Sequence, residues 1–149
     1  MTITKWVWSV LVAGVLLSSF QNSFLWAGDD ATWPQWRGPK RDGSVIGGSW
    51  PGTLQAPALK KLWREKLPPS YSGTVVSTDK VFVTYTRDEM YEGVRALNRN
   101  NGKQVWQSEW KATMKVAGLG TGMGSWIRAT PAYEQDGLFV AGMPDLLVS

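Results

Sequence analysis

The stretch ALNRNNGKQVW, residues 96–106, has the pattern of two strands joined by a tight turn. Residues 90–97 and residues 103–110 are short runs with the composition of β-strands. Between them, residues 98–102 combine three asparagines with Gly102, and both residue types tolerate a positive φ. The stretch therefore predicts an antiparallel hairpin, in which Gly102 permits the turn.

Two further strands are expected just before this hairpin. Residues 72–77 include the apolar, β-branched Val75 and Val76, and residues 80–86 alternate between the two faces of a sheet. Thr78 and Asp79 supply the turn between these two strands. The four strands make one antiparallel meander, and no helix longer than two turns is predicted after the N-terminal segment.

The meander is repeated along the chain. Residues 62–64 correspond to residues 105–107, which lie 43 positions later. Residues 72–76 correspond to residues 128–132, and residues 80–83 correspond to residues 137–140. These later matches are more widely spaced because the first loop of the second copy is longer. A period of about 40–45 residues with four strands per unit is typical of a propeller blade.

Residues 96–106 resemble the tryptophan-docking repeat of pyrroloquinoline-quinone-like β-propellers, whose pattern is A-x-D-x-x-T-G-K-x-x-W. Four positions match as they stand, Ala96, Gly102, Lys103 and Trp106. Asparagine replaces the aspartate and the threonine of the pattern. The opening WPQWRGP, residues 33–39, also resembles the start of exported propellers of this type from Planctomycetes-like bacteria.

This resemblance covers about residues 32–148 and implies an all-β fold. We expect a partial propeller of about two to three four-stranded antiparallel blades, preceded by a signal helix. Ala96, Gly102 and Trp106 are expected to be a structural docking motif, with Trp106 buried between neighbouring sheets. Because propellers of this family usually have eight blades, we expect the chain to be the N-terminal fragment of a longer protein.

The N-terminus has the order of an export signal. Lys5 is followed by an apolar run over residues 6–20, and a small residue, Ala27, precedes Asp29 and Asp30. Residues 6–28 carry no charge and are also long enough for an uncleaved membrane anchor. Either alternative places the rest of the chain in the periplasm or outside the cell, with membrane contact only through this segment.

We therefore divide the chain into three parts. Residues 1–27 are the signal peptide or anchor, residues 28–58 are an irregular Trp/Pro/Gly-rich extension, and residues 59–149 are incomplete propeller repeats. In the extension, Trp33, Trp36 and Trp50 are expected to pack on the body of the protein, because large aromatic side chains are seldom left in water. A carbohydrate-stacking surface is the alternative for these three rings.

The composition excludes several kinds of site. The sequence contains no cysteine and no histidine, which rules out disulfides, thiolate nucleophiles, Ser-His-Asp triads and Cys/His zinc sites. A bound metal would need oxygen ligands, which favours calcium or magnesium. The net charge is +4, but the densest basic run, residues 60–66, includes Glu65 and is interpreted as a solvated surface rather than a nucleic-acid site.

Three parts of the sequence contain residue types that can bind a ligand or a metal ion. The glycine-rich residues 118–124 match no phosphate-binding pattern and are interpreted as an inter-blade loop. Asp88, Glu89 and Glu92 are expected at a solvated hairpin tip, with calcium binding as the alternative. Arg128 stands just before a predicted inner strand and is the candidate for contact with an anionic ligand or cofactor.

Two functions remain open at this point. The first is a non-catalytic scaffold that binds a protein or a ligand, with other exported or outer-membrane proteins as partners and no cofactor. It resembles the outer-membrane assembly propellers in fold but lacks their lipidated cysteine. The second is part of a quinoprotein dehydrogenase, for which the resemblance implies pyrroloquinoline quinone and calcium. No catalytic residue and no metal ligand of such an enzyme can be assigned in this sequence.

Overall fold

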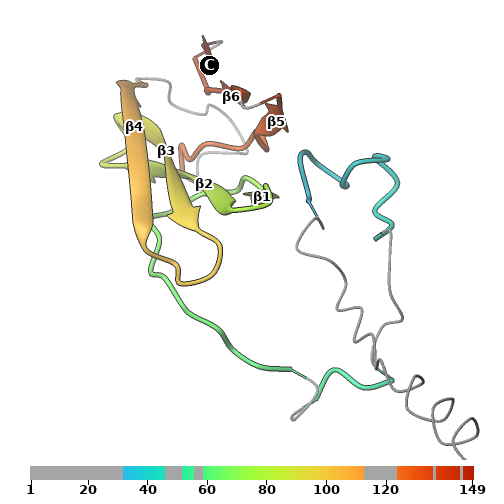
Figure 1. Ribbon diagram of the computed structural model, residues 1–149. Coiled ribbons are helices and arrows are strands. Elements are labelled where there is room, and N and C mark those ends of the chain that lie inside the picture. Colours follow the sequence, from blue (N-terminus) through green and yellow to red (C-terminus); the bar gives the residue numbers. More distant parts are fainter. Residues whose placement is uncertain (1–31, 46–51, 56–58, 113–123, 136, 145) are drawn as a thin grey trace, which may run out of the picture.

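The computed structural model describes residues 32–45, 52–55, 59–112, 124–135, 137–144 and 146–149. They form seven strands: β1 (Val75–Val76), β2 (Lys80–Arg87), β3 (Tyr91–Asn98), β4 (Gln104–Lys111), β5 (Ala132–Glu134), β6 (Gly137–Ala141) and β7 (Leu147–Val148). These strands make two antiparallel sheets, with the orders β1-β2-β3-β4 and β5-β6-β7 (Figure 1). No helix occurs in the described residues, so the all-β prediction is confirmed. The expected signal segment, Trp50 and most of the glycine-rich loop lie outside them.

The first sheet is the predicted meander. The strands β2 and β3 pair along their full length, from Lys80 opposite Asn98 to Arg87 opposite Tyr91. The turn from β3 to β4 is held by its own asparagines, because Asn98 Oδ1 accepts the backbone N–H of Asn100 at 3.0 Å and of Asn101 at 3.2 Å. Gly102 closes it with a φ of 71°. The asparagine at position 98 thus satisfies the turn's backbone donors through its side chain.

The core lies between the two sheets. One face of the first sheet contributes Val75, Phe82, Val94 and Ala96, and the second sheet with its preceding segment contributes Ile127 and Val140. The rings of Phe82 and Tyr133 stack across this core with centroids 5.3 Å apart. Burial of such apolar side chains contributes roughly 1.5–3 kcal/mol each to folding, so this interface holds the two sheets together.

The two sheets begin later than the repeat predicts. Residues 72–74 and residues 128–131 are not strand. They run side by side instead, since Tyr71 N–H donates to Ile127 O at 2.9 Å and Gly73 N–H donates to Thr130 Oγ1 at 3.0 Å. These hydrogen bonds link the segments that lead into the two sheets. They replace the strand-to-strand hydrogen bonds that the repeat predicts at the start of each sheet.

The N-terminal extension contacts the edge strands β1 and β5 of the two sheets. Trp33 exchanges two backbone hydrogen bonds with Val76 of β1, at 2.7 and 2.9 Å, and Pro34 O accepts the N–H of Tyr133 in β5 at 2.8 Å (Figure 1). The Trp33 ring packs on Gly38, where a Cβ would lie only 2.7 Å from it. Trp33 thus pairs with the body of the protein through its backbone, while its ring packs on Gly38 within the extension. The expectation that Trp36 packs on the body is wrong, because its side chain is exposed.

Candidate functional site

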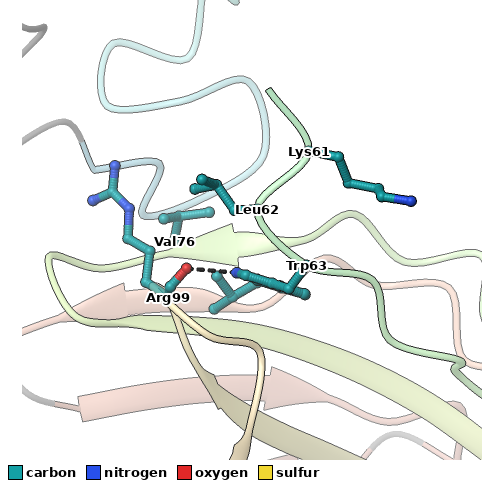
Figure 2. A pocket seen from close by; sticks show the side chains of 6 residues that line it. Lys61, Leu62, Trp63, Val76 and Arg99 are labelled. Carbon is teal, nitrogen blue, oxygen red and sulfur yellow. Dashed lines mark hydrogen bonds between the residues drawn. The ribbon is translucent and has the colours of Figure 1, made fainter. Parts of the chain in front are cut away.

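The indole of Trp63 is fixed on the turn between β3 and β4. Its Nε1–H donates to Arg99 O at 2.7 Å (Figure 2). A Cβ on Gly102 would lie 2.6 Å from the indole ring, so only glycine leaves room for it. Trp63 has the same place in the first repeat that Trp106 has in the second. One tryptophan of the repeat therefore lies on the hairpin turn of the following sheet.

An open pocket of about 440 Å³ adjoins Trp63. Its lining is Lys61, Leu62, Trp63, Val76, Val81 and Arg99. Figure 2 shows the Lys61 side chain extending away from Trp63. The guanidinium of Arg99 donates to Ser77 O at 3.2 Å, which fixes it at the rim. The lining has no carboxylate or hydroxyl side chain, so this pocket can hold an apolar group but offers no nucleophile or general acid.

Trp106 is not buried as predicted. Its side chain is 37% exposed, and its ring packs on Phe82 with centroids 6.0 Å apart. Ala96, opposite Trp106 in the ladder, is fully buried, so the small residue does leave room on this face. The third strand of the second sheet is only Leu147–Val148. The expectation that this ring is buried came from the docking motif alone.

The three neighbouring acidic residues Asp88, Glu89 and Glu92 lie in different environments in the structure. Asp88 and Glu89 are exposed at the turn from β2 to β3, with φ of 55° and 53°. Glu92, by contrast, is 1% exposed, so its assignment to a solvated tip is wrong. Its carboxylate accepts the Met143 N–H at 3.0 and 3.1 Å and the Trp110 indole N–H at 3.3 Å. Alternation along β3 turns this side chain into the interface between the sheets.

The environment of Glu92 shifts its protonation equilibrium. Burial raises the pKa of the Glu92 carboxyl, and the hydrogen bonds from Met143 and Trp110 only partly oppose this. Gly142 lies against the same group, because a Cβ there would meet Glu92 Oε2 at 2.7 Å. Glu92 is thus a buried acceptor that joins β3 to the loop after β6. Sequence reasoning missed this role, because the partners are distant in the chain: Trp110 is 18 residues away and Met143 is 51.

A second group of hydrogen-bonded polar side chains, Tyr85, Arg87 and Glu109, lies on the other face of the first sheet. Glu109 accepts two bonds from Arg87, at 2.6 and 3.1 Å, and one from the Tyr85 hydroxyl at 3.1 Å. The Arg87 guanidinium lowers the pKa of the Glu109 carboxyl, and burial raises the pKa of Tyr85. The three side chains are hydrogen-bonded to one another. We therefore interpret them as a structural link between β2 and β4 rather than as a catalytic site.

Arg128 belongs to an aromatic cluster on the surface. Its guanidinium lies 5.0 Å from the centre of the Tyr71 ring, and Tyr71 stacks on Trp126 with centroids 5.0 Å apart. Arg128 Nη2 also donates to Gly124 O at 3.4 Å. Arg128 and Tyr71 are exposed. The sequence indicated Arg128 alone. Sequence reasoning missed Trp126, two residues before Arg128, and Tyr71, which matches residue 127 in the repeat alignment.

The described residues show neither a metal-binding cluster nor a membrane-spanning helix. They contain no group of three acidic side chains that could hold a metal ion. None of their elements is a helix with the length and apolar character needed to cross a membrane. The clusters around Trp63, Glu92 and Arg128 are the candidate sites in this part of the chain. The Arg128 cluster presents an exposed guanidinium beside two stacked rings, whereas Arg37 lies over the single ring of Trp36 and Arg87 over that of Tyr91.

Comparison with known proteins returned no relative. No family model, no curated protein and no solved structure matches this chain.

Proposed function

We propose that the chain forms two consecutive blades of an exported β-propeller of the pyrroloquinoline-quinone-like repeat type and serves as a non-catalytic binding scaffold. The observation that carries this proposal is the contact of Trp63 with the Gly102 turn. The resemblance implies that the tryptophan of one repeat packs flat on the next blade, and Trp63 lies in that relation to the first sheet. The two successive antiparallel sheets support the same assignment.

The binding surface in this proposal is the cluster of Arg128, Tyr71 and Trp126. A guanidinium attracts carboxylates and phosphates, and exposed ring faces favour a flat ligand. The cluster lies where the segments that lead into β1 and β5 run side by side. In a propeller the first strand of each blade is the innermost, so this cluster belongs near the central channel. We propose an anionic ligand with a flat face.

A titration with two probes tests this binding surface. Pyrroloquinoline quinone is a flat polyanion, and citrate is a polyanion without a ring. Calorimetry on the full chain should give tighter binding of the quinone than of citrate. Arg128→Gln should weaken quinone binding about tenfold, the loss expected for one charge-assisted hydrogen bond.

Arg37 provides the matched control, because its guanidinium also lies over an indole, that of Trp36, at 5.5 Å. Arg37→Gln should leave the affinity unchanged. Equal losses in the two variants would reduce the effect to net charge and contradict the assignment of the site.

A quinoprotein dehydrogenase remains the second candidate, because the repeat resemblance includes such enzymes. Their chemistry needs calcium held by several oxygen ligands beside the quinone. The full chain is to be mixed with pyrroloquinoline quinone and calcium, and dye reduction followed with a panel of alcohols and sugars. We expect the rate of the free cofactor, because two blades cannot enclose the quinone. Turnover above that background would favour the dehydrogenase.

The proposal includes export through the N-terminal segment. The partners proposed for the scaffold are therefore other exported or outer-membrane proteins, and membrane contact is assigned to the N-terminal segment alone. Nucleic acid is not among the proposed partners, because charges of both signs are mixed along the chain.

A further inference from the structure

The turn between β3 and β4 contains the only Asn-Gly pair of the sequence, Asn101 and Gly102. In such a pair the backbone nitrogen of the glycine can attack the side-chain amide of the asparagine, because glycine has no Cβ to screen its nitrogen. Asn101 is exposed, whereas Gly102 is buried. The structure requires glycine at position 102, because its φ is 71° and the indole of Trp63 lies against it. The packing of Trp63 on this turn therefore places a glycine directly after an exposed asparagine.

The reaction of this pair needs only water as a second reactant. The Gly102 nitrogen gives its proton to a base in solvent and forms a bond to Asn101 Cγ. The bond from Cγ to the side-chain nitrogen breaks, and ammonia leaves. Water then opens the cyclic imide at one of its two carbonyl groups. Opening at the side-chain carbonyl gives aspartate, whereas opening at the backbone carbonyl gives isoaspartate, whose main chain is one atom longer.

The folded turn keeps the attacking nitrogen unreactive. The Gly102 N–H donates to Asn98 O at 2.8 Å, and the indole of Trp63 lies over the same residue. A base must reach this proton before the nitrogen can attack. The side chain of Asn101 is engaged as well, because its Oδ1 accepts the Lys103 N–H at 2.9 Å. Closure of the imide ring thus requires that Trp63 leaves the turn and that the turn opens.

Trp63 is the contact that decides how often this turn opens. It belongs to residues 60–66, whose backbone groups form no hydrogen bond with a described residue. The Trp63 side chain holds this segment on the first sheet, through its bond of 2.7 Å to Arg99 O (Figure 2). Segments with few backbone hydrogen bonds open at a lower free energy than core strands do. The rate of reaction at Asn101 then follows the population of chains in which Trp63 is off the turn.

We propose that Asn101 is a site of spontaneous deamidation that the indole of Trp63 suppresses, and that its isoaspartate product prevents Trp63 from binding again. The extra main-chain atom lies inside the turn that the Gly102 N–H closes on Asn98 O, so the surface that receives the indole is lost. Release of Trp63 thereby becomes permanent. The aspartate product keeps the ordinary backbone and an acceptor for the Lys103 N–H, and it leaves the contact intact. The inference does not depend on the blade assignment.

Peptide mapping of the full chain by mass spectrometry tests the suppression. In mildly alkaline buffer, Asn101 of the folded chain should react at least about tenfold more slowly than in urea, because the closed turn must open first. Trp63→Ala should raise the rate in buffer by about tenfold. Trp106→Ala is the matched control, since that ring packs on Phe82, and it should leave the rate unchanged. Asn100 is exposed in the same turn but precedes an asparagine, so it reports any reaction that does not need glycine.

Circular dichroism shows whether each variant folds. If Trp63→Ala does not fold, Trp63→Phe takes its place, because phenylalanine keeps a ring over Gly102 and loses only the bond to Arg99 O. A smaller acceleration is then expected. A folded natural chain that reacts as fast as the chain in urea would overturn the proposal. So would a rate that rises equally when Trp63 and Trp106 are replaced.

The effect of the product is measured on aged natural chain. The isoaspartate form is separated by chromatography and identified by isoaspartyl methyltransferase labelling. Its urea midpoint should fall to that of Trp63→Ala, while Asn101→Asp should match the natural chain. In Trp63→Ala the isoaspartate should cause no further loss, because the contact is already absent. An isoaspartate form as stable as the natural chain, or one that destabilises Trp63→Ala by the same amount, would show that the product does not act through Trp63.

Discussion

Replacing Trp63 with alanine is expected to lower the free energy of unfolding by about 3 kcal/mol, the lower end of the range for large aromatic side chains in cores. The change removes the indole from Gly102 and leaves Arg99 O without the donor that now lies 2.7 Å away. It also opens the pocket between residues 60–66 and the first sheet, because Trp63 lines that pocket. Urea unfolding followed by circular dichroism measures the loss.

Trp106 is the matched control, because it has the same position in the other repeat. Its ring is 37% exposed and packs mainly on Phe82. Trp106→Ala should therefore cost only about 1–2 kcal/mol in the isolated chain, since much of the area is already in water. Equal losses from the two substitutions would contradict the special role of Trp63 on the Gly102 turn. A larger loss at Trp106 would place a turn of another blade over its ring.

The first sheet was predictable because its determinants are local. The turn at residues 98–102 is fixed by asparagine side chains that bond to backbone groups two or three residues away. Alternation in β2 and turn chemistry then set the register of the meander. The observed strands lie within a few residues of the predicted ones. Local patterns of this kind do not depend on what packs against the sheet.

The wrong predictions concern side chains whose environment is set by contacts between distant segments. Strand alternation places Glu92 on the face of Val94 and Ala96, but its donors come from the loop after β6 and from β4. Burial of Trp106 was inferred from the motif, whereas the residue is 37% exposed. Trp33 pairs through its backbone with Val76 and Trp36 is exposed, although both stand in one aromatic stretch. No single-sequence pattern distinguishes these cases.

The Arg128 site was predictable only in part. Its charge and its place before a predicted strand were visible in the sequence, and the structure adds two rings beside it. Tyr71 reaches the cluster because its N–H bonds to Ile127 O, which brings two segments 56 positions apart together. A repeat alignment brings residues 71 and 127 to matching positions, but it does not indicate that they are in contact.

Glu92→Leu is expected to lower the free energy of unfolding by about 2–3 kcal/mol at neutral pH. Leucine has a similar volume, so the loss comes from the acceptor rather than from a cavity. The Met143 N–H and the Trp110 indole N–H would lose their partner, and an unmet donor in a part-buried site costs roughly 1–3 kcal/mol. Glu92→Gln keeps one acceptor oxygen and is the matched control.

The pH dependence separates the two roles of Glu92, buried acceptor and buried charge. Because burial raises the pKa of Glu92 above its ordinary value of 4.5, the folded protein binds this proton more tightly than the unfolded chain. The contribution of Glu92 to stability is therefore fully present below pH 4.5, falls as the pH rises through the folded-state pKa, and is constant above it.

Glu92→Gln removes that slope, so the variant should equal or exceed the natural chain at neutral pH and lose its advantage in acid. Urea unfolding of both chains between acid and neutral pH measures the difference. A natural chain that gains stability over Glu92→Gln as the pH rises would show that the hydrogen bonds from Met143 and Trp110 outweigh the cost of burying the charge.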